Sequence, residues 1–269
     1  MRDRDWLKLA IVEFLGPFAL VFAGVGAIVQ TQGQNLVAVA LAHGLAIGVM
    51  ISALGHITGG VFNPAVTLGL LVARRIEARR ALLYVVAQLL GAIAAAGLLT
   101  LVYPDLGALG RNNAGINLGV PSIGGGFSTT NALVMEIVLT FFLMLVIFGI
   151  GVDHRTSRTV TGLVIGLTIT LDIFAGGAVS GAAMNPARAF GPALIQQDFA
   201  DHWVWWVGPA IGAAIAALLY NDVLLRGTAP SDDETMSQHR PREAPDSIPV
   251  GQVEAVRSHR SRRSGRRRR

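Results

Sequence analysis

The chain has 269 residues, of which 52% are hydrophobic and only 14% charged, and its mean hydropathy is +0.53. Soluble globular domains carry roughly 25% charged residues, so this composition excludes an ordinary soluble domain and favours a membrane protein. The net charge of +5 belongs to residues 226–269, because residues 1–225 carry as many acidic as basic side chains. The absence of cysteine excludes disulfides, thiolate metal sites and a cysteine nucleophile.

Six stretches are long and apolar enough to cross a bilayer, for which a helix needs about 20 residues. In chain order they are residues 9–30, 36–56, 81–102, 131–152, 159–178 and 203–225. The first follows a charged N-terminal segment, 1–8. It is too long for the apolar region of a signal peptide, and no small-residue cleavage site closes it. Pro17 lies inside this span and is expected to kink it.

Two further apolar pieces, 64–73 and 186–195, are too short to span, since ten residues of helix measure about 15 Å. Each begins at a copy of the same tripeptide: Asn63-Pro64-Ala65 and Asn185-Pro186-Ala187. Asparagine is a good N-cap, and proline is tolerated in the first turn of a helix but not in its interior. The two pieces are therefore predicted to be half-helices that meet at the bilayer midplane and together match one hydrocarbon thickness.

Residues 9–102 and 131–225 read as two copies of one unit, joined by a Gly- and Asn-rich external loop over 103–130. Asn63 follows Glu13 by 50 residues, and Asn185 follows Glu136 by 49. Each unit has three spans, an odd number, so the second enters the membrane from the opposite side. An inverted repeat of this kind places its site at the midplane, where the broken helices meet. The predicted fold class is an all-α membrane protein with six spans and two half-helices.

Lysine and arginine cluster in alternate connections, which places both termini in the cytoplasm. The cytoplasmic side carries the N-terminal charges, those of 74–80 and 155–158, and the tail 226–269, whereas Arg111 and Arg188 fall elsewhere. The tail is poor in large apolar residues and is predicted to be disordered. Its basic end suits anionic lipid headgroups, with an inert solvated tail as the alternative. Because no aromatic residue interrupts the basic run, nucleic acid is not the expected partner.

The half-helices and the charges inside the spans suggest a chemistry. Two helix N-termini, each carrying about +0.5 charge, would together oppose cations and protons at the midplane. The amides of Asn63 and Asn185 would hold a passing water by its oxygen and so interrupt a proton-conducting chain. Arg188, within the first turn of its half-helix, indicates function because an intramembrane arginine is costly. Glu13 and Glu136 are either proton relays or, as one per repeat favours, acceptors for loop backbone.

The motifs resemble those of the aquaporin family (major intrinsic proteins) over residues 9–225. They lie at 56–67, 180–192 and 202–209, and include both Asn-Pro-Ala copies with arginine after the second. The resemblance implies an aquaporin-like right-handed bundle that acts as a passive water channel, with no enzyme activity, cofactor or metal. It also implies a homotetramer with one pore per subunit, embedded in lipid, in the plasma (cell inner) membrane.

By resemblance, four residues form a selectivity filter: His43, Ile173, Ala182 and Arg188. Strict water channels of the family usually pair a phenylalanine with a histidine there, whereas this set is similar to that of plant vacuolar-membrane aquaporins. It implies passage of water and of small neutral solutes (ammonia, urea, hydrogen peroxide, with glycerol as the outermost candidate) and exclusion of protons and ions. Without the family register, His43 would be interpreted as a packed core residue.

The main alternative is a glycerol facilitator. Glycerol facilitators typically have Asp and Lys at the positions of Ala189 and Ala193 in this chain. They typically have Pro and an aliphatic residue at the positions of Trp205 and Trp206. These differences favour the water branch of the family. An ion-coupled secondary transporter would need a coupling-ion site, for which only the intramembrane acids are candidates. No credible nucleophile–base pair supports an enzyme. Asp172 stays open between pairing with a polar neighbour and lining the outer vestibule.

Overall fold

The computed structural model describes residues 3–103 and 118–225. Within this part of the chain six helices are long and apolar enough to cross a membrane, which confirms the six predicted spans. Their bounds are α1 (Asp3–Thr31), α2 (Leu36–Thr58), α4 (Ala78–Val102), α5 (Thr129–Ile147), α6 (Thr161–Ser180) and α8 (Val204–Leu219). The tail 226–269 and most of the connecting loop lie outside the described residues.

Three short helical segments extend the spans. The π-helical segments η2 (Phe148–Val152) and η4 (Tyr220–Leu224) continue α5 and α8, and the 3₁₀-helical segment η3 (Arg158–Val160) precedes α6. Local sequence explains several ends. Asn35 caps α2 by accepting a hydrogen bond from the Ala38 amide, and Ser128 caps α5 in a capping box with Asn131. Glycines in the left-handed region, Gly59 and Gly181, end α2 and α6.

The helix that contains the first span is longer than the apolar stretch itself. α1 begins at Asp3 rather than at residue 9, because nothing in the charged segment breaks a helix and an acidic residue suits the first turn. α1 continues through Pro17 as a single helix.

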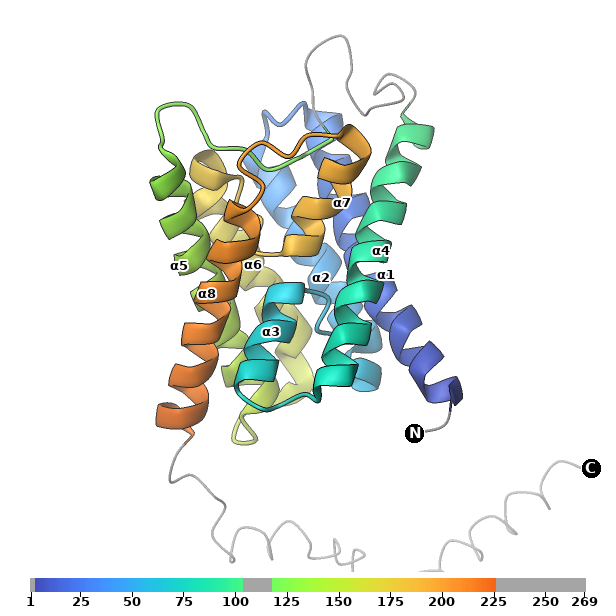
Figure 1. The fold of residues 1–269 in the computed structure, drawn as a ribbon, viewed down its shortest axis with the longest axis vertical. Coiled ribbons are helices and arrows are strands. Elements are labelled where there is room, and N and C mark those ends of the chain that lie inside the picture. The colour runs from blue at the N-terminus through green and yellow to red at the C-terminus, as the bar shows by residue number, and fades with distance from the viewer. Residues whose placement is uncertain (1–2, 104–117, 226–269) are drawn as a thin grey trace, which may run out of the picture. The chain divides into compact units, whose positions relative to one another are not determined.

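The two half-helices are present as predicted. α3 (Pro64–Val72) has 9 residues and α7 (Pro186–Gln196) has 11, and each starts with the proline of its tripeptide. In Figure 1 the half-helices lie in opposite halves of the bundle, α7 above α3, with their N-terminal ends toward the middle.

Helix packing reflects the internal repeat. α1 packs against α2 and α4, and the equivalent α5 packs against α6 and α8. Each half-helix packs mainly against the third span of the other repeat, α3 on α8 and α7 on α4. α1 and α5 also enter the bundle from opposite ends (Figure 1). The two repeats are therefore interlocked, and their half-helices are held at the centre by both.

The two repeats also meet where α2 crosses α6. A Cβ added at Gly48 would lie 3.0 Å from the carbonyl oxygen of Gly162, so the absence of a side chain permits this close approach. Small residues allow helix backbones to approach in lipid, where van der Waals packing drives association.

An ion pair between Arg155 and Asp153 lies at the end of the bundle that carries the arginine-rich connections. The carboxylate of Asp153, just after η2, accepts hydrogen bonds from Arg155 and from the Tyr220 hydroxyl on η4. The hydrogen bonds from Arg155 hold the pKa of Asp153 well below its usual range.

Candidate functional site

Asn63 and Asn185 cap the two half-helices in the same way. The Asn63 Oδ1 accepts hydrogen bonds from the amides of Ala65 at 2.9 Å and Val66 at 3.5 Å. The Asn185 Oδ1 accepts from Ala187 at 3.0 Å and from the next amide along at 3.3 Å. Each side-chain oxygen thus faces its own helix, which leaves both amide nitrogens directed elsewhere.

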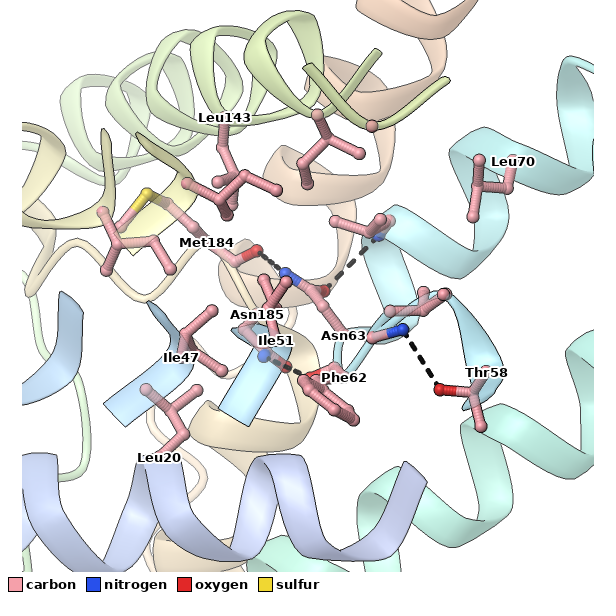
Figure 2. A pocket seen from close by; sticks show the side chains of 18 of the residues that line it. Leu20, Ile47, Ile51, Thr58, Phe62, Asn63, Leu70, Leu143, Met184 and Asn185 are labelled. Atoms are coloured by element: carbon pink, nitrogen blue, oxygen red, sulfur yellow. Dashed lines mark hydrogen bonds between the residues drawn. The ribbon is translucent and has the colours of Figure 1, made fainter. Parts of the chain in front are cut away.

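Those amide nitrogens bind across the repeat boundary. The Asn63 Nδ2 donates to the Met184 carbonyl at 2.8 Å, and the Asn185 Nδ2 donates to the Phe62 carbonyl at 3.0 Å. Figure 2 shows these crossed hydrogen bonds between labelled residues. An amide nitrogen carries two hydrogens, so each asparagine keeps one further donor after making its crossed bond. The orientation of both donors is therefore fixed by the fold.

The backbone that leads into each half-helix follows the same unusual path twice. Phe62 and Met184, each immediately before its asparagine, have φ of 50° and 51°, in the left-handed region that few non-glycine residues adopt. The equivalent pair two residues earlier, Gly60 and Ala182, has φ of 64° and 45°. Such strained conformations persist only when their surroundings hold them.

Glu13 supplies that support in the first repeat. Its carboxylate accepts hydrogen bonds from the amides of Val61 at 3.2 Å and Phe62 at 2.8 Å, and from the Gln88 side chain at 2.8 Å. Gln88 in turn contacts the Thr67 hydroxyl on α3. The glutamate side chain is fully buried.

Glu136 does the same in the second repeat. It accepts from the amides of Ala183 at 2.9 Å and Met184 at 2.7 Å, and from the Ser180 hydroxyl at 2.7 Å. The Ser180 carbonyl accepts from the indole nitrogen of buried Trp205 at 2.9 Å. Each glutamate thus accepts hydrogen bonds from the non-helical backbone of its own repeat. This is the contact expected if the two acids support the loops and are not proton relays.

A cavity of about 360 Å³ runs past the two asparagines. Apolar side chains, including Leu20, Ile47, Ile51 and Leu143, line it beside Asn63, Asn185 and the backbone before them (Figure 2). The cavity therefore has a mostly apolar wall with the amide donors and loop backbone as its polar stripe.

The ends of the cavity are charged. Arg188 and His43 line one end, and the other is lined by Arg75, Arg80 and Arg158 from the connections assigned to the cytoplasm. The basic side chains and the two helix N-termini between them together give the cavity a positive electrostatic potential.

Three of the four predicted filter residues line this cavity: His43, Ala182 and Arg188. Ile173 is buried and belongs to the same hydrophobic cluster as Ala182, but it is not among the cavity-lining residues. The structure thus brings Ile173 close to the predicted filter without placing it on the cavity wall.

Arg188 is buried, and its guanidinium donates through Nη1 to the carbonyl of Gly119 at 2.6 Å. The partner comes from the end of the connecting loop, which the sequence reasoning treated only as a connection. Arg188 is therefore not a surface arginine that extends to the membrane interface, because its side chain is only 3% exposed.

His43 is also held in place. Its Nδ1 lies 2.8 Å from the Val39 carbonyl oxygen. Because a carbonyl oxygen can only accept, Nδ1 carries the hydrogen and, in the neutral ring, Nε2 is an acceptor. Nε2 has no hydrogen-bond partner among residues 3–103 and 118–225. Gly24 on α1 provides room for the ring, since a Cβ there would overlap it. Nε2 is thus a buried acceptor without a partner in this part of the chain.

Other candidate groups lie apart from the cavity. Asp172 is buried and is not among the cavity-lining residues, and its Oδ2 has no partner in the part of the chain that the structure describes. Trp203 is half exposed, as expected for an interfacial aromatic residue. Over the described ranges no cluster of three His, Asp or Glu residues could hold a metal.

Six spans, two half-helices that meet head to head and a cavity passing their N-termini define a multi-pass membrane channel built from an inverted repeat. The sequence pattern of the family described as Major intrinsic protein matches residues 1–220, so the chain belongs to this family, the aquaporins. It is a channel of that family and not an enzyme.

Its relatives include aquaporins from animals and plants. The chain is 44% identical to Aquaporin-5 of Sus scrofa over 219 residues, covering 80% of each chain. It is 44% identical to Aquaporin TIP4-1 of Arabidopsis thaliana over 244 residues, covering 86% of this chain and 92% of the other. Among solved structures, the aquaglyceroporin from Plasmodium falciparum is similar, with a TM-score of 0.74 and 27% identity over 81% of this chain and 97% of that one.

Proposed function

We propose that the protein is a passive channel for water and for small neutral solutes (ammonia, urea, hydrogen peroxide and, at the upper limit, glycerol) that excludes protons and ions. The observation that carries this proposal is the crossed pair of asparagines, Asn63 and Asn185, on the wall of one cavity. Each uses one amide hydrogen to bind the opposite loop and keeps a second for the lumen.

Proton exclusion follows from this arrangement. A water molecule that accepts hydrogen bonds from both asparagines presents its hydrogens outward along the path in both directions. Its oxygen lone pairs are then occupied and cannot accept a proton from the next water. The N-termini of α3 and α7 add positive potential at the same depth, which opposes hydronium as well as metal cations.

The solute range depends on the proposed filter. His43, Ala182 and Arg188 line the cavity. Arg188 offers hydrogen-bond donors, the unpartnered Nε2 of His43 offers an acceptor, and Ala182 contributes little bulk. A filter that has His43 in place of the phenylalanine of strict water channels, with Ala182 on its wall, leaves room beyond a single water. Two curated relatives are an Aquaporin-5 and an Aquaporin TIP4-1, which supports the water branch.

A glycerol facilitator is the second candidate, since the similar solved structure is described as an aquaglyceroporin. Ala189 and Ala193 are both fully buried, so there is little room there for the Asp and Lys typical of that branch. An ion-coupled transporter is less well supported, because Glu13 and Glu136 are engaged by loop backbone in each repeat.

Placement and assembly belong to the same proposal. The alternation of basic residues supports cytoplasmic termini. The proposed location is the plasma (cell inner) membrane. The long apolar side chains exposed on α2 and α6, including Leu41, Leu45, Leu163 and Leu167, suit contact with lipid or with neighbouring subunits of a homotetramer. The basic tail is proposed to contact anionic lipid headgroups.

Stopped-flow light scattering of proteoliposomes tests the proposed solute range, with water, urea and glycerol measured in parallel. His43→Phe is expected to reduce urea and glycerol permeation relative to water, because it narrows the filter. His56→Phe, on the exposed face of the same helix α2, is the matched control and should change nothing. Urea and glycerol rates equal to those of empty vesicles would remove the wide-filter proposal, and unchanged rates in His43→Phe would remove His43 from the filter.

A further inference from the structure

The partner of Arg188 is itself held by a buried side chain of the same half-helix. The Leu118 amide donates to the Gln196 Oε1 at 2.6 Å, and the adjoining Gly119 carbonyl accepts from the Arg188 Nη1 at 2.6 Å. Gln196 is the last residue of α7 and only 3% exposed, and Arg188 is in the first turn. The segment Leu118–Gly119 therefore bridges the two ends of one half-helix.

Packing also restrains the segment Leu118–Gly119, in addition to the hydrogen bond to Gln196. Leu118 is fully buried in a hydrophobic cluster with residues of α1, α4 and α7. Gly119 has φ of +64°, and a Cβ there would lie 2.9 Å from Ile28 and 3.2 Å from Val25. The backbone is thus pressed against α1, and its direction determines where the Gly119 carbonyl points.

We propose that Gln196 is a positioning residue for Arg188. Gln196 holds the Leu118 amide, and the adjoining Gly119 carbonyl then holds the guanidinium of Arg188 against the wall of the cavity. The inference rests on the proposed channel function and adds a determinant of permeation outside the four filter residues. Without the Gln196 acceptor, the buried Leu118 amide loses its partner and the segment shifts to find another. The guanidinium, no longer held, then enters the lumen and obstructs it.

The test uses Gln196→Met, which keeps the length of the side chain and removes the acceptor. Water permeability per reconstituted channel is expected to fall about fivefold, the population change that corresponds to a hydrogen bond worth about 1 kcal/mol, and its activation energy should rise. Gln196→Glu retains an oxygen at the same place and should restore most of the permeability. Gln197→Met, at the exposed neighbouring glutamine, is the matched control and should behave as the unmodified protein.

A double-mutant cycle separates positioning from a general loss of stability. In an Arg188→Ala background there is no guanidinium to position, so adding Gln196→Met should leave the water permeability of the single Arg188→Ala variant unchanged. An equal fall in both backgrounds would overturn the inference, as would wild-type permeability and activation energy in Gln196→Met alone. If the unmodified protein conducts no water, the proposed function itself fails, which is a different result from either of these.

Discussion

Replacing Glu136 by glutamine separates the structural interpretation of this residue from a proton-relay role. The carboxylate accepts three hydrogen bonds, from the Ser180 hydroxyl at 2.7 Å and the amides of Ala183 and Met184 at 2.9 and 2.7 Å. A glutamine amide presents one oxygen and one donor nitrogen, so at least one of the two backbone amides loses its acceptor and faces another donor. A buried donor left unsatisfied costs about 1–3 kcal/mol, which is the expected loss of stability.

The assay measures the thermal unfolding midpoint in detergent together with water flux per folded channel. Glu136→Gln should lower the midpoint while the flux of the folded fraction stays close to that of the unmodified protein. Glu13→Gln is the matched variant in the first repeat, and it should cost less, because one of its backbone hydrogen bonds is already long at 3.2 Å. Unchanged stability with lost or newly pH-dependent transport would refute the structural role and favour a relay.

Three further perturbations follow from named contacts. Gly24→Ala should displace the His43 ring, at an overpacking cost of about 1–3 kcal/mol, and change the ratio of urea to water permeability in stopped-flow measurements; an unchanged ratio would contradict the placement of the ring. Trp205→Phe should leave the carbonyl that ends α6 without its donor and destabilise the protein by about 1–3 kcal/mol, seen as a lower unfolding midpoint; an unchanged midpoint would contradict it. Asp153→Asn should lower the midpoint near pH 7. Because Arg155 depresses the pKa of Asp153, the stabilisation is present above about pH 4 and is lost as the pH falls further, so the variant and the unmodified protein should converge in acid; a constant difference would count against the ion pair.

The sequence was sufficient for the fold because its signals are local. Apolar length predicts the six spans, and the Asn-Pro pairs mark the starts of α3 and α7 without reference to any tertiary contact. The helix α1 extends further than the predicted span 9–30, since a charged segment can continue a helix beyond the bilayer.

The candidate site was only partly predictable, because its partners are backbone atoms. The carbonyls of Phe62 and Met184, which accept from the crossed asparagines, owe their direction to positive φ angles that neither residue type favours. The position of Ile173 shows a further limit, since spacing along the chain does not determine whether a side chain reaches the cavity wall. Its place in the filter stays a prediction.

Gly119 and Gln196 were missed altogether. The loop was interpreted as polar and external, yet residues 118–121 at its end are a short, fully buried stretch. That stretch, Leu118 to Pro121, contains Leu118 and Val120 but no charged residue, and this was the available signal that this end of the loop packs inside the protein. The acceptor on Gln196 could not be paired with it from sequence, because the two are joined only by the tertiary fold.

The most direct test of the account measures water and proton permeability in the same proteoliposomes. Vesicles with the protein should shrink faster than empty vesicles under an osmotic step, with a low activation energy. Under an imposed pH gradient with the membrane potential clamped, a trapped pH-sensitive dye should report proton flux equal to that of the empty vesicles. Shrinkage no faster than the empty control, or proton flux above it, would contradict a water path interrupted at Asn63 and Asn185.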